Sequence, residues 1–417
     1  MMIKIEGGRV IDPANGFDQI ADITIDESGV IASSPAGGET VNANGMLVIP
    51  GVVDLCARLR EPGKTHKATI RSEARAAAIC GITTLCMPPD TLPVVDSQAV
   101  MDLIKLRVAA AQGANVVMLG ALTQGLEGEL LAQMAALKAA GCVGFSNANK
   151  PIPNALVLRR AMEYAASLGI TVFLNSEDPQ LSQNGCMHEG AVSTELGLPG
   201  IPTSAEVVGL ARDLALVEQT GARAHFGRLS TARAVEMVRE AKQRGLPVTA
   251  DVAAHQLLLT ESDVRGFNRQ THVRPPLRSE ADRAALVAGV TDGTIDAICS
   301  DHQPHESDAK LAPFPATEAG ISALDTLIPI VMQLVNDKHI PLSTAVAAIT
   351  ANPASILGLK SGTLSGGSRG DLAIVSQTSW ELSADLCASE QQNTPFLGHA
   401  FSHRVVLGLV GGRKATG

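Results

Sequence analysis

Eight short apolar runs, most of them followed by an alanine-rich amphipathic stretch, constrain the fold of this chain more than any other feature. The runs lie at residues 52–56, 82–87, 115–120, 142–145, 171–174, 222–226, 248–252 and 297–299. Strand-type runs that alternate with helical patterns indicate βαβ units and a parallel sheet. A doubly wound sheet would carry a glycine-rich turn after its first strand, and the first run has none. We therefore predict an α/β fold in which residues 51–357 form a (β/α)8 TIM-type barrel.

The two ends of the chain carry a different pattern, in which short apolar runs alternate with Gly, Asn and Pro turns. IKIEGGRVI and ADITIDESGVI near the start, and GDLAIVSQ and HRVVLGLVGGRK near the end, are typical of strands and turns. Neither end has enough strands to bury a face by itself. We predict that residues 1–50 and 358–417 combine into one small β-sandwich domain.

Charge and composition argue against some classes of function. The chain has 33 Lys and Arg against 42 Asp and Glu, a net charge of −9, and only 2% aromatic residues. Nucleic acids are bound by clustered cations and stacking rings, so we expect no nucleic-acid partner. No apolar run is long enough to span a membrane, and the first residues resemble a strand rather than a signal peptide. We therefore expect no membrane partner and a cytoplasmic location.

The residues that follow the predicted strands form a poor set of metal ligands. In barrels of this kind the catalytic side chains come from the carboxyl ends of the strands. These ends carry one carboxylate, Asp301, together with Cys56, Arg58, Asn147, Asn175 and Arg228. Zinc requires several converging His, Cys or carboxylate ligands, and two guanidinium groups would repel a divalent cation. We call the opening at the carboxyl ends of the strands the mouth of the barrel. The residues alone predict that this mouth is empty or holds an anion.

Several segments at and beside these strand ends together resemble dihydroorotase, a cyclic-amide hydrolase of the amidohydrolase superfamily. They are PGVVD at 50–54 leading into LREPG at 59–63, the NGCMHEG to LGLPGIP run at 184–202, LSTARAVEMVREAKQRG at 229–245, PPLR at 275–278 and SDHQPH at 300–305. The resemblance covers nearly the whole chain. It implies the barrel fold and a place in pyrimidine biosynthesis.

The chain departs from this family at the metal ligands. In active members the first strand ends in a His-x-His pair, which Cys56 and Arg58 replace here. The family's other ligands, an Asp after strand four and a His after each of strands five and six, match Asn147, Asn175 and Arg228. Only Asp301 is retained, so the resemblance implies that Asp301 is vestigial, that no catalytic set is intact, and that zinc is lost and no cofactor is bound.

The substrate side of the resemblance is also incomplete. Arg60 and His305 match two of the groups with which the family holds the substrate carboxylate. Asp90 and Arg274 stand where the family has asparagines. The resemblance therefore implies a vestigial half of the anion clamp, formed by Arg60 and His305.

The residues leave alternatives open at the mouth. Its four arginines (Arg58, Arg60, Arg228 and Arg274) either form salt bridges with Asp54, Asp301, Glu177 and Asp178, which we favour, or bind an anionic metabolite. Asp301 is better explained as a structural carboxylate than as a catalytic base, and Cys56 as an inert buried thiol than as a reactive one. We expect His225 and His255 to be core histidines. A weak single-metal site at Asp301, His302 and His305 is the less favoured reading.

Two functions from different classes follow. The first is an inactive dihydroorotase homologue that acts as a structural, scaffolding subunit. The resemblance implies that its partner is the aspartate transcarbamoylase catalytic chain, in a homo- or hetero-oligomer. The alternative is an active or altered-chemistry cyclic-amide hydrolase that uses a reduced or single-metal site.

Overall fold

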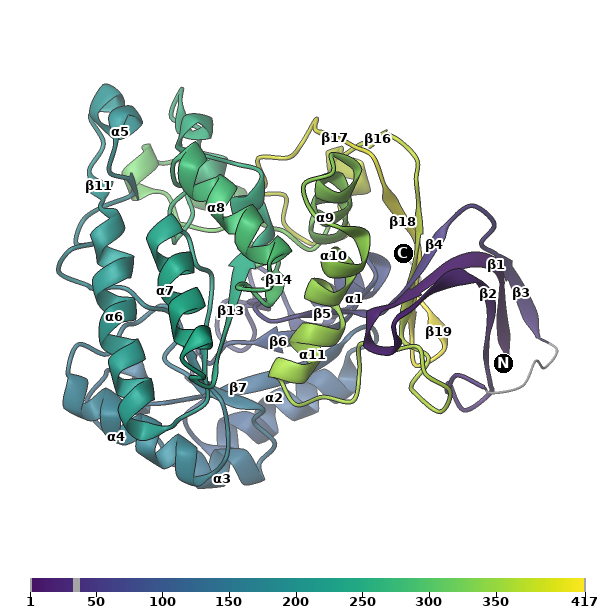
Figure 1. The fold of residues 1–417 in the computed structure, drawn as a ribbon, viewed down its shortest axis with the longest axis horizontal. Helices are drawn as coiled ribbons and strands as arrows, with labels where there is room; N and C mark the ends of the chain where they lie inside the picture. Colours follow the sequence, from purple (N-terminus) through teal and green to yellow (C-terminus); the bar gives the residue numbers. More distant parts are fainter. Residues whose placement is uncertain (1, 33–37, 416–417) are drawn as a thin grey trace.

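A parallel sheet of eight strands forms the centre of the molecule, and helices surround it (Figure 1). The computed structural model describes residues 2–32 and 38–415. The strands are β5 (Val52–Asp54), β6 (Ile82–Met87), β7 (Asn115–Ala121), β8 (Gly144–Ser146), β9 (Val172–Leu174), β12 (Ala224–Phe226), β13 (Val248–Ala253) and β14 (Ala297–Cys299). Each of the eight predicted runs contains or overlaps one of them. The predicted (β/α)8 barrel is confirmed.

The barrel closes between its first and last strands, just beyond their ends. The backbone N–H of Arg58 donates to the carbonyl of His302 (2.9 Å), and the N–H of His302 donates to the carbonyl of Cys56 (3.2 Å). The side chain of Asp54 accepts from the backbone N–H of Ser300 (2.8 Å). Residues nearly 250 positions apart are thereby held together at the carboxyl end of the barrel.

Some of the helices that cover the barrel begin at a capping side chain. Thr69 caps α1, Thr231 caps α7, and Ser279 caps α8, each accepting a hydrogen bond from a backbone N–H of the first turn. The helices are α1 (Ile70–Ile79), α2 (Gln98–Ala110), α3 (Met134–Ala139), α4 (Ala155–Ser167), α5 (Ala191–Leu196), α6 (Thr203–Thr220), α7 (Ala232–Gln243), α8 (Glu280–Thr291), α9 (Leu327–Asn336), α10 (Leu342–Ile349) and α11 (Ala351–Ile356). Their alanine-rich faces let them lie close to the strands, in one continuous apolar core.

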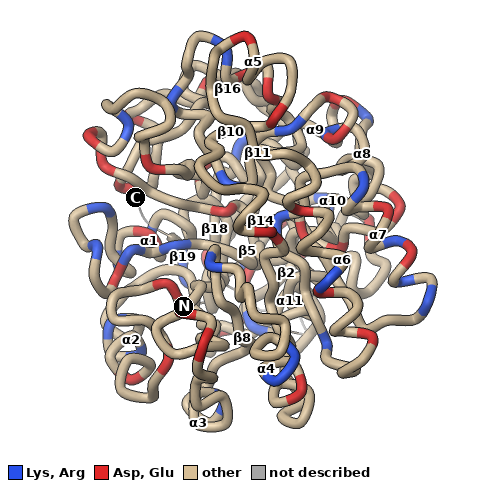
Figure 2. Tube along the Cα trace, turned by 90° about the vertical axis from the view of Figure 1, so that its left-hand side faces the viewer, with Lys and Arg blue, Asp and Glu red and all other residues tan. Residues whose placement is uncertain are grey.

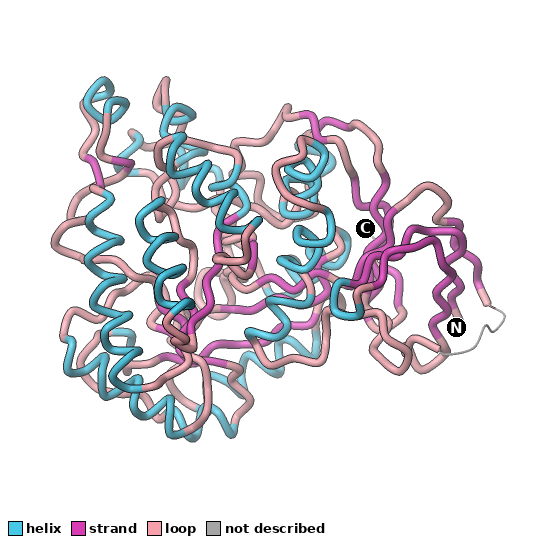
Figure 3. Tube along the Cα trace, in the orientation of Figure 1, coloured by secondary structure: helices cyan, strands magenta, loops and turns pink. Residues whose placement is uncertain are grey.

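The two chain ends form one β domain, as predicted (Figure 3). Its strands are β1 (Ile3–Asp12), β2 (Phe17–Ile25), β3 (Glu39–Asn42), β4 (Leu47–Pro50), β15 (Leu372–Ser376), β18 (Arg404–Val410) and β19 (Arg413–Lys414). Antiparallel pairing of β4 with β15 joins the two ends. The strands belong to a single sheet, which has its own small core separate from that of the barrel.

A C-terminal segment between β15 and β18 leaves that sheet and packs on the barrel. It contains β16 (Trp380–Glu381) and β17 (Ala400–Phe401), and Phe396 and Phe401 join the barrel core. Ser389 donates to the buried carboxylate of Glu73 in α1 (2.7 Å). A second excursion, with the strands β10 (Met187–His188) and β11 (Gly200–Ile201) around α5, lies between β9 and α6.

In the view of Figure 2, Lys and Arg are interspersed with Asp and Glu. Within residues 2–32 and 38–415, no helix combines the length and hydropathy that a membrane span requires.

Candidate functional site

The carboxyl ends of the barrel strands hold most of the residues singled out from the sequence. Three of them, Arg60, Arg228 and Asp301, have positive φ values of 62°, 57° and 47°. Non-glycine residues seldom adopt this left-handed conformation, and they do so mostly where tertiary structure requires it. The strand ends at the mouth are thus held in defined turns.

Asp301 lies at the centre of a buried network of ion pairs. Arg228 Nη1 donates to Asp301 Oδ1 at 2.8 Å, and Arg58 Nη1 lies 3.3 Å from the same oxygen. Arg58 Nε also donates to Asp90 Oδ2 at 2.8 Å. The side chains of Arg58, Arg228 and Asp301 are only 5%, 6% and 2% exposed. The two guanidinium groups therefore take Asp301 as their shared counter-ion.

The cysteine and asparagines of the mouth complete this network. The thiol of Cys56 lies 3.4 Å from Asp301 Oδ1 and 3.2 Å from Arg228 Nη1. Arg228 Nη2 donates to Asn149 Oδ1 at 2.8 Å, and Asn175 Nδ2 donates to the same oxygen at 3.1 Å. With Asp90, side chains from six strand ends are thus joined directly.

One predicted member does not belong to the network. The Asn147 amide donates to the backbone carbonyls of Lys150 (3.0 Å) and Leu126 (3.3 Å), and its oxygen accepts from Thr123 (2.8 Å). These bonds hold the loop after β8. Asn149, two residues further on, is the residue that reaches Arg228. Sequence matching pointed to this loop but not to the residue whose side chain enters the mouth.

Burial and neighbouring charges set the protonation states. Burial raises the pKa of the Cys56 thiol to about 12, even though Arg228 and Arg58 favour its thiolate. Burial would also raise the pKa of Asp301, but Arg228 and Arg58 outweigh it and leave that pKa below its ordinary value. Cys56 is therefore a neutral thiol, and Asp301 is an ionised carboxylate whose proton affinity is too low for a good general base.

The histidines near Asp301 use their ring nitrogens elsewhere. His302 Nε2 lies 2.9 Å from Glu73 Oε2, and Nδ1 accepts from the backbone N–H of Ala323 (3.1 Å). His305 Nδ1 lies 3.1 Å from Lys67 Nζ, and burial lowers the pKa of His305 to about 2. Among the described residues, no three or more His, Cys, Asp and Glu side chains are grouped so that they could hold a metal ion. The donor set of the mouth does not fit the family's zinc.

The expected salt bridges are present in part. Arg274 pairs with Glu177, whereas Asp54 and Asp178 bind no arginine of the mouth in the part of the chain that the structure describes. Arg60 donates to the carbonyl of Pro304 (3.0 Å) and lies 3.0 Å from His305 Nε2. No sequence pattern predicted Asp90 as the partner of Arg58.

His225 and His255, the two expected core histidines, are buried. His225 lies between Asp251 and Thr249, 2.8 Å from each, and is not exposed to the mouth. Burial lowers the pKa of His255 to about 4. Both have the surroundings of core histidines.

Several of the segments that carry the resemblance meet beside the mouth. Arg278 of the PPLR segment donates to the Ile201 carbonyl (2.6 Å) and to the Ser230 hydroxyl (3.2 Å). Glu206 accepts from the backbone N–H of Ser230 (2.8 Å) and from its hydroxyl (2.7 Å). These residues fix loops around the mouth, which is a structural role that does not require catalysis.

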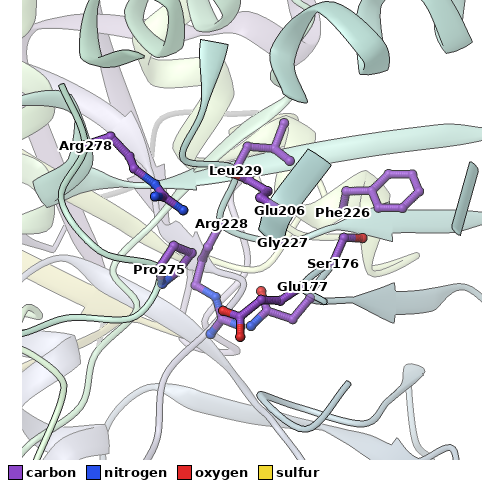
Figure 4. Close-up of a pocket in the computed structure, with 10 residues that line it drawn as sticks. Ser176, Glu177, Glu206, Phe226, Gly227, Arg228, Leu229, Pro275 and Arg278 are labelled. Atoms are coloured by element: carbon purple, nitrogen blue, oxygen red, sulfur yellow. The ribbon is translucent and has the colours of Figure 1, made fainter. Parts of the chain in front are cut away.

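The pocket beside Arg228 at this end of the barrel is small. A pocket lined by Asn175, Glu177, Arg228, Pro275 and Arg278, among others, has a cavity volume of about 10 Å³ (Figure 4). That volume holds about one water molecule. A cyclic amide could enter this pocket only if Arg228 or Glu177 moved.

Asp54 gives a first testable prediction. Burial raises the pKa of this fully buried carboxyl group to about 6, although it accepts hydrogen bonds from Ser300. Because the folded-state pKa lies above the unfolded one, the contribution of Asp54 to stability is complete below about pH 4 and is lost as the pH rises through 6.

Between pH 5 and pH 8 the unfolding free energy of the natural protein should therefore fall by about 1–2 kcal/mol more than that of Asp54→Asn. Urea unfolding of both proteins across this range measures the difference. A difference that does not change with pH would show that Asp54 titrates normally.

Known proteins resemble this chain over nearly its whole length. Residues 45–234 match the family model described as Dihydro-orotase-like. The chain is 47% identical over 422 residues to a protein of Pseudomonas putida named "Dihydroorotase-like protein", with 100% of both chains covered. A protein of the same name from Pseudomonas aeruginosa is 46% identical, and a "Dihydroorotase" of Geobacter sp. is 42% identical, each with 99% of both chains covered.

Solved structures share the fold at lower identity. An L-hydantoinase (dihydropyrimidinase) from Arthrobacter aurescens superposes with a TM-score of 0.88 at 22% identity, covering 99% of this chain and 95% of that chain. A D-hydantoinase (dihydropyrimidinase) from Thermus sp. gives a TM-score of 0.84 at 22% identity, with 99% and 94% covered. At this identity the likeness establishes the barrel and its β domain only.

Proposed function

We propose that this chain, which belongs to the dihydroorotase-like family, is a non-catalytic member of that family and acts as a structural subunit. The observation that carries this proposal is the ion network at the barrel mouth. Arg58 and Arg228 hold the one retained carboxylate, Asp301, and occupy positions at which the family binds its metal. An amide is a poor electrophile, and water at its ordinary pKa attacks it only slowly without a Lewis acid.

The arrangement of the network supports this reading over an altered hydrolase. A general base must be free to accept a proton from the attacking water. Asp301 Oδ1 is taken by two guanidinium groups, and Asp301 Oδ2 accepts from the Gln303 amide (3.2 Å). The thiol of Cys56 is protonated at neutral pH because its pKa is about 12. No side chain of the network is thus in the state that acid–base or nucleophilic catalysis needs.

The proposed partner is the aspartate transcarbamoylase catalytic chain of de novo pyrimidine biosynthesis. Two features support this partner. One is the family resemblance, and the other is a barrel that is intact although the residues at the family's metal-ligand positions have changed. A scaffold acts by mass action: a subunit that binds only the folded, assembled enzyme stabilises it as the subunit's concentration rises above the dissociation constant.

Co-expression tests this proposal. The transcarbamoylase of the same organism is produced with and without this chain, and its activity and solution mass are measured. We expect a larger assembly and higher or more lasting activity when this chain is present. Equal mass and activity in both preparations would refute the scaffold role.

Elemental analysis and a turnover assay test the non-catalytic part separately. The chain is purified without chelators and incubated with dihydroorotate. We expect neither stoichiometric zinc nor turnover. Zinc at one or more atoms per chain that supports dihydroorotate hydrolysis would refute this part and favour the hydrolase.

A further inference from the structure

A second cavity lies at the opposite end of the barrel from the mouth. It has a volume of about 450 Å³ and is lined by residues that precede β8, β9, β12 and β13, and by the end of α11. We call it the floor cavity. Its volume falls within the range of small-molecule sites, whereas the mouth pocket holds about one water.

Apolar side chains make up much of the wall of the floor cavity, and polar atoms contribute the rest of its surface. Ile170 and Leu357 are buried at its base, and Val143, Leu246 and Ile356 are half-buried around it. Binding a compact apolar group would remove these side chains from water, which is favourable in proportion to the area covered. The floor cavity therefore suits a ligand with an aliphatic or aromatic body.

One cationic side chain lines the floor cavity. Arg223 is the single charged residue among those lining the cavity. Its guanidinium group donates to the Gly169 carbonyl and forms no ion pair with any carboxylate in the part of the chain described. The other polar side chains that line the cavity are those of Thr171, Thr249 and Ser355. A carboxylate on the ligand would give Arg223 the partner that the chain does not supply.

We propose that the floor cavity binds a small amphipathic monocarboxylate, with its apolar body against Ile170 and Ile356 and its carboxylate at Arg223. In enzymes of this fold the active site lies at the carboxyl ends of the strands, so a ligand at the floor is separate from the family's chemistry. The proposal does not depend on the scaffold function.

Titration with octanoate tests this proposal, observed by NMR of the isoleucine and leucine methyl groups of the full-length protein. We expect saturable shifts at Ile170 and Ile356, with a dissociation constant of about 1 mM for a ligand of this size. Arg223→Met should weaken octanoate about three- to five-fold and leave 1-octanol unaffected, because only the exposed ion pair is lost. Arg244→Met, another exposed arginine outside the cavity, is the matched control.

A second variant tests the position of the ligand. Ser355 is exposed at the edge of the cavity, so Ser355→Trp should fill it without disturbing the core and abolish the shifts with both ligands. Ser167→Trp, at an exposed serine of α4 outside the cavity, should bind as the natural protein does. Absence of saturable shifts at Ile170 and Ile356, or octanoate binding that survives Ser355→Trp, would overturn the proposal.

Discussion

Replacing Asp301 by alanine is expected to lower the free energy of unfolding by about 3–5 kcal/mol. The carboxylate is 2% exposed and is the shared counter-ion of Arg58 and Arg228, which are 5% and 6% exposed. Its removal leaves two buried cations facing each other, with Asp90 paired to only one of them. Thermal and urea unfolding of the purified variant measure the loss.

The matched control is an exposed pair. Arg233 and Glu240 lie 3.2 Å apart with side chains more than half exposed, and Glu240→Ala should cost no more than about 1 kcal/mol. Because the pKa of Asp301 is lowered in the folded protein, its stabilisation is present above the unfolded pKa and is lost on acidification through the folded one. Equal losses for the two variants at neutral pH would mean that the network contributes little.

We expect zinc to bind only after all five ligand positions of the mouth are substituted together. The double variant Cys56→His, Arg58→His leaves Arg228 beside Asp301, so we expect no zinc and no dihydroorotate hydrolysis. Adding Asn149→Asp, Asn175→His and Arg228→His removes the second guanidinium group that contacts Asp301 and supplies a His and carboxylate set. This quintuple variant should then bind zinc stoichiometrically, as measured by elemental analysis after dialysis.

The quintuple variant also tests which asparagine faces the mouth. Asn147 is held by backbone carbonyls of its own loop, whereas Asn149 contacts both Arg228 and Asn175. A parallel variant with Asn147→Asp in place of Asn149→Asp should bind zinc more weakly. Stronger binding by that variant, or hydrolysis by the double variant, would show that the ligand positions are misassigned.

The sequence alone was sufficient for the architecture, because strand and helix patterns are local. Alternation of apolar and polar residues and the spacing of alanine-rich stretches depend on neighbours a few positions apart. The eight strands therefore appear where their runs predict them, and β4 meets β15 because neither chain end could bury its face alone. The identity of the residues at the strand ends likewise showed, without a structure, that a full zinc set is absent from those positions.

Only the tertiary structure decided which side chains meet. The Asp301 carboxylate finds Arg58 and Arg228 from strand ends 243 and 73 positions away, and no local pattern encodes that contact. The same holds for His302, which is directed to Glu73 in α1 rather than to Asp301, and for Asn149 in place of Asn147. These outcomes depend on strand register and on loop turns with positive φ, which set the direction of each side chain by tertiary packing. Closure of the mouth and the cavity at the floor follow from that packing.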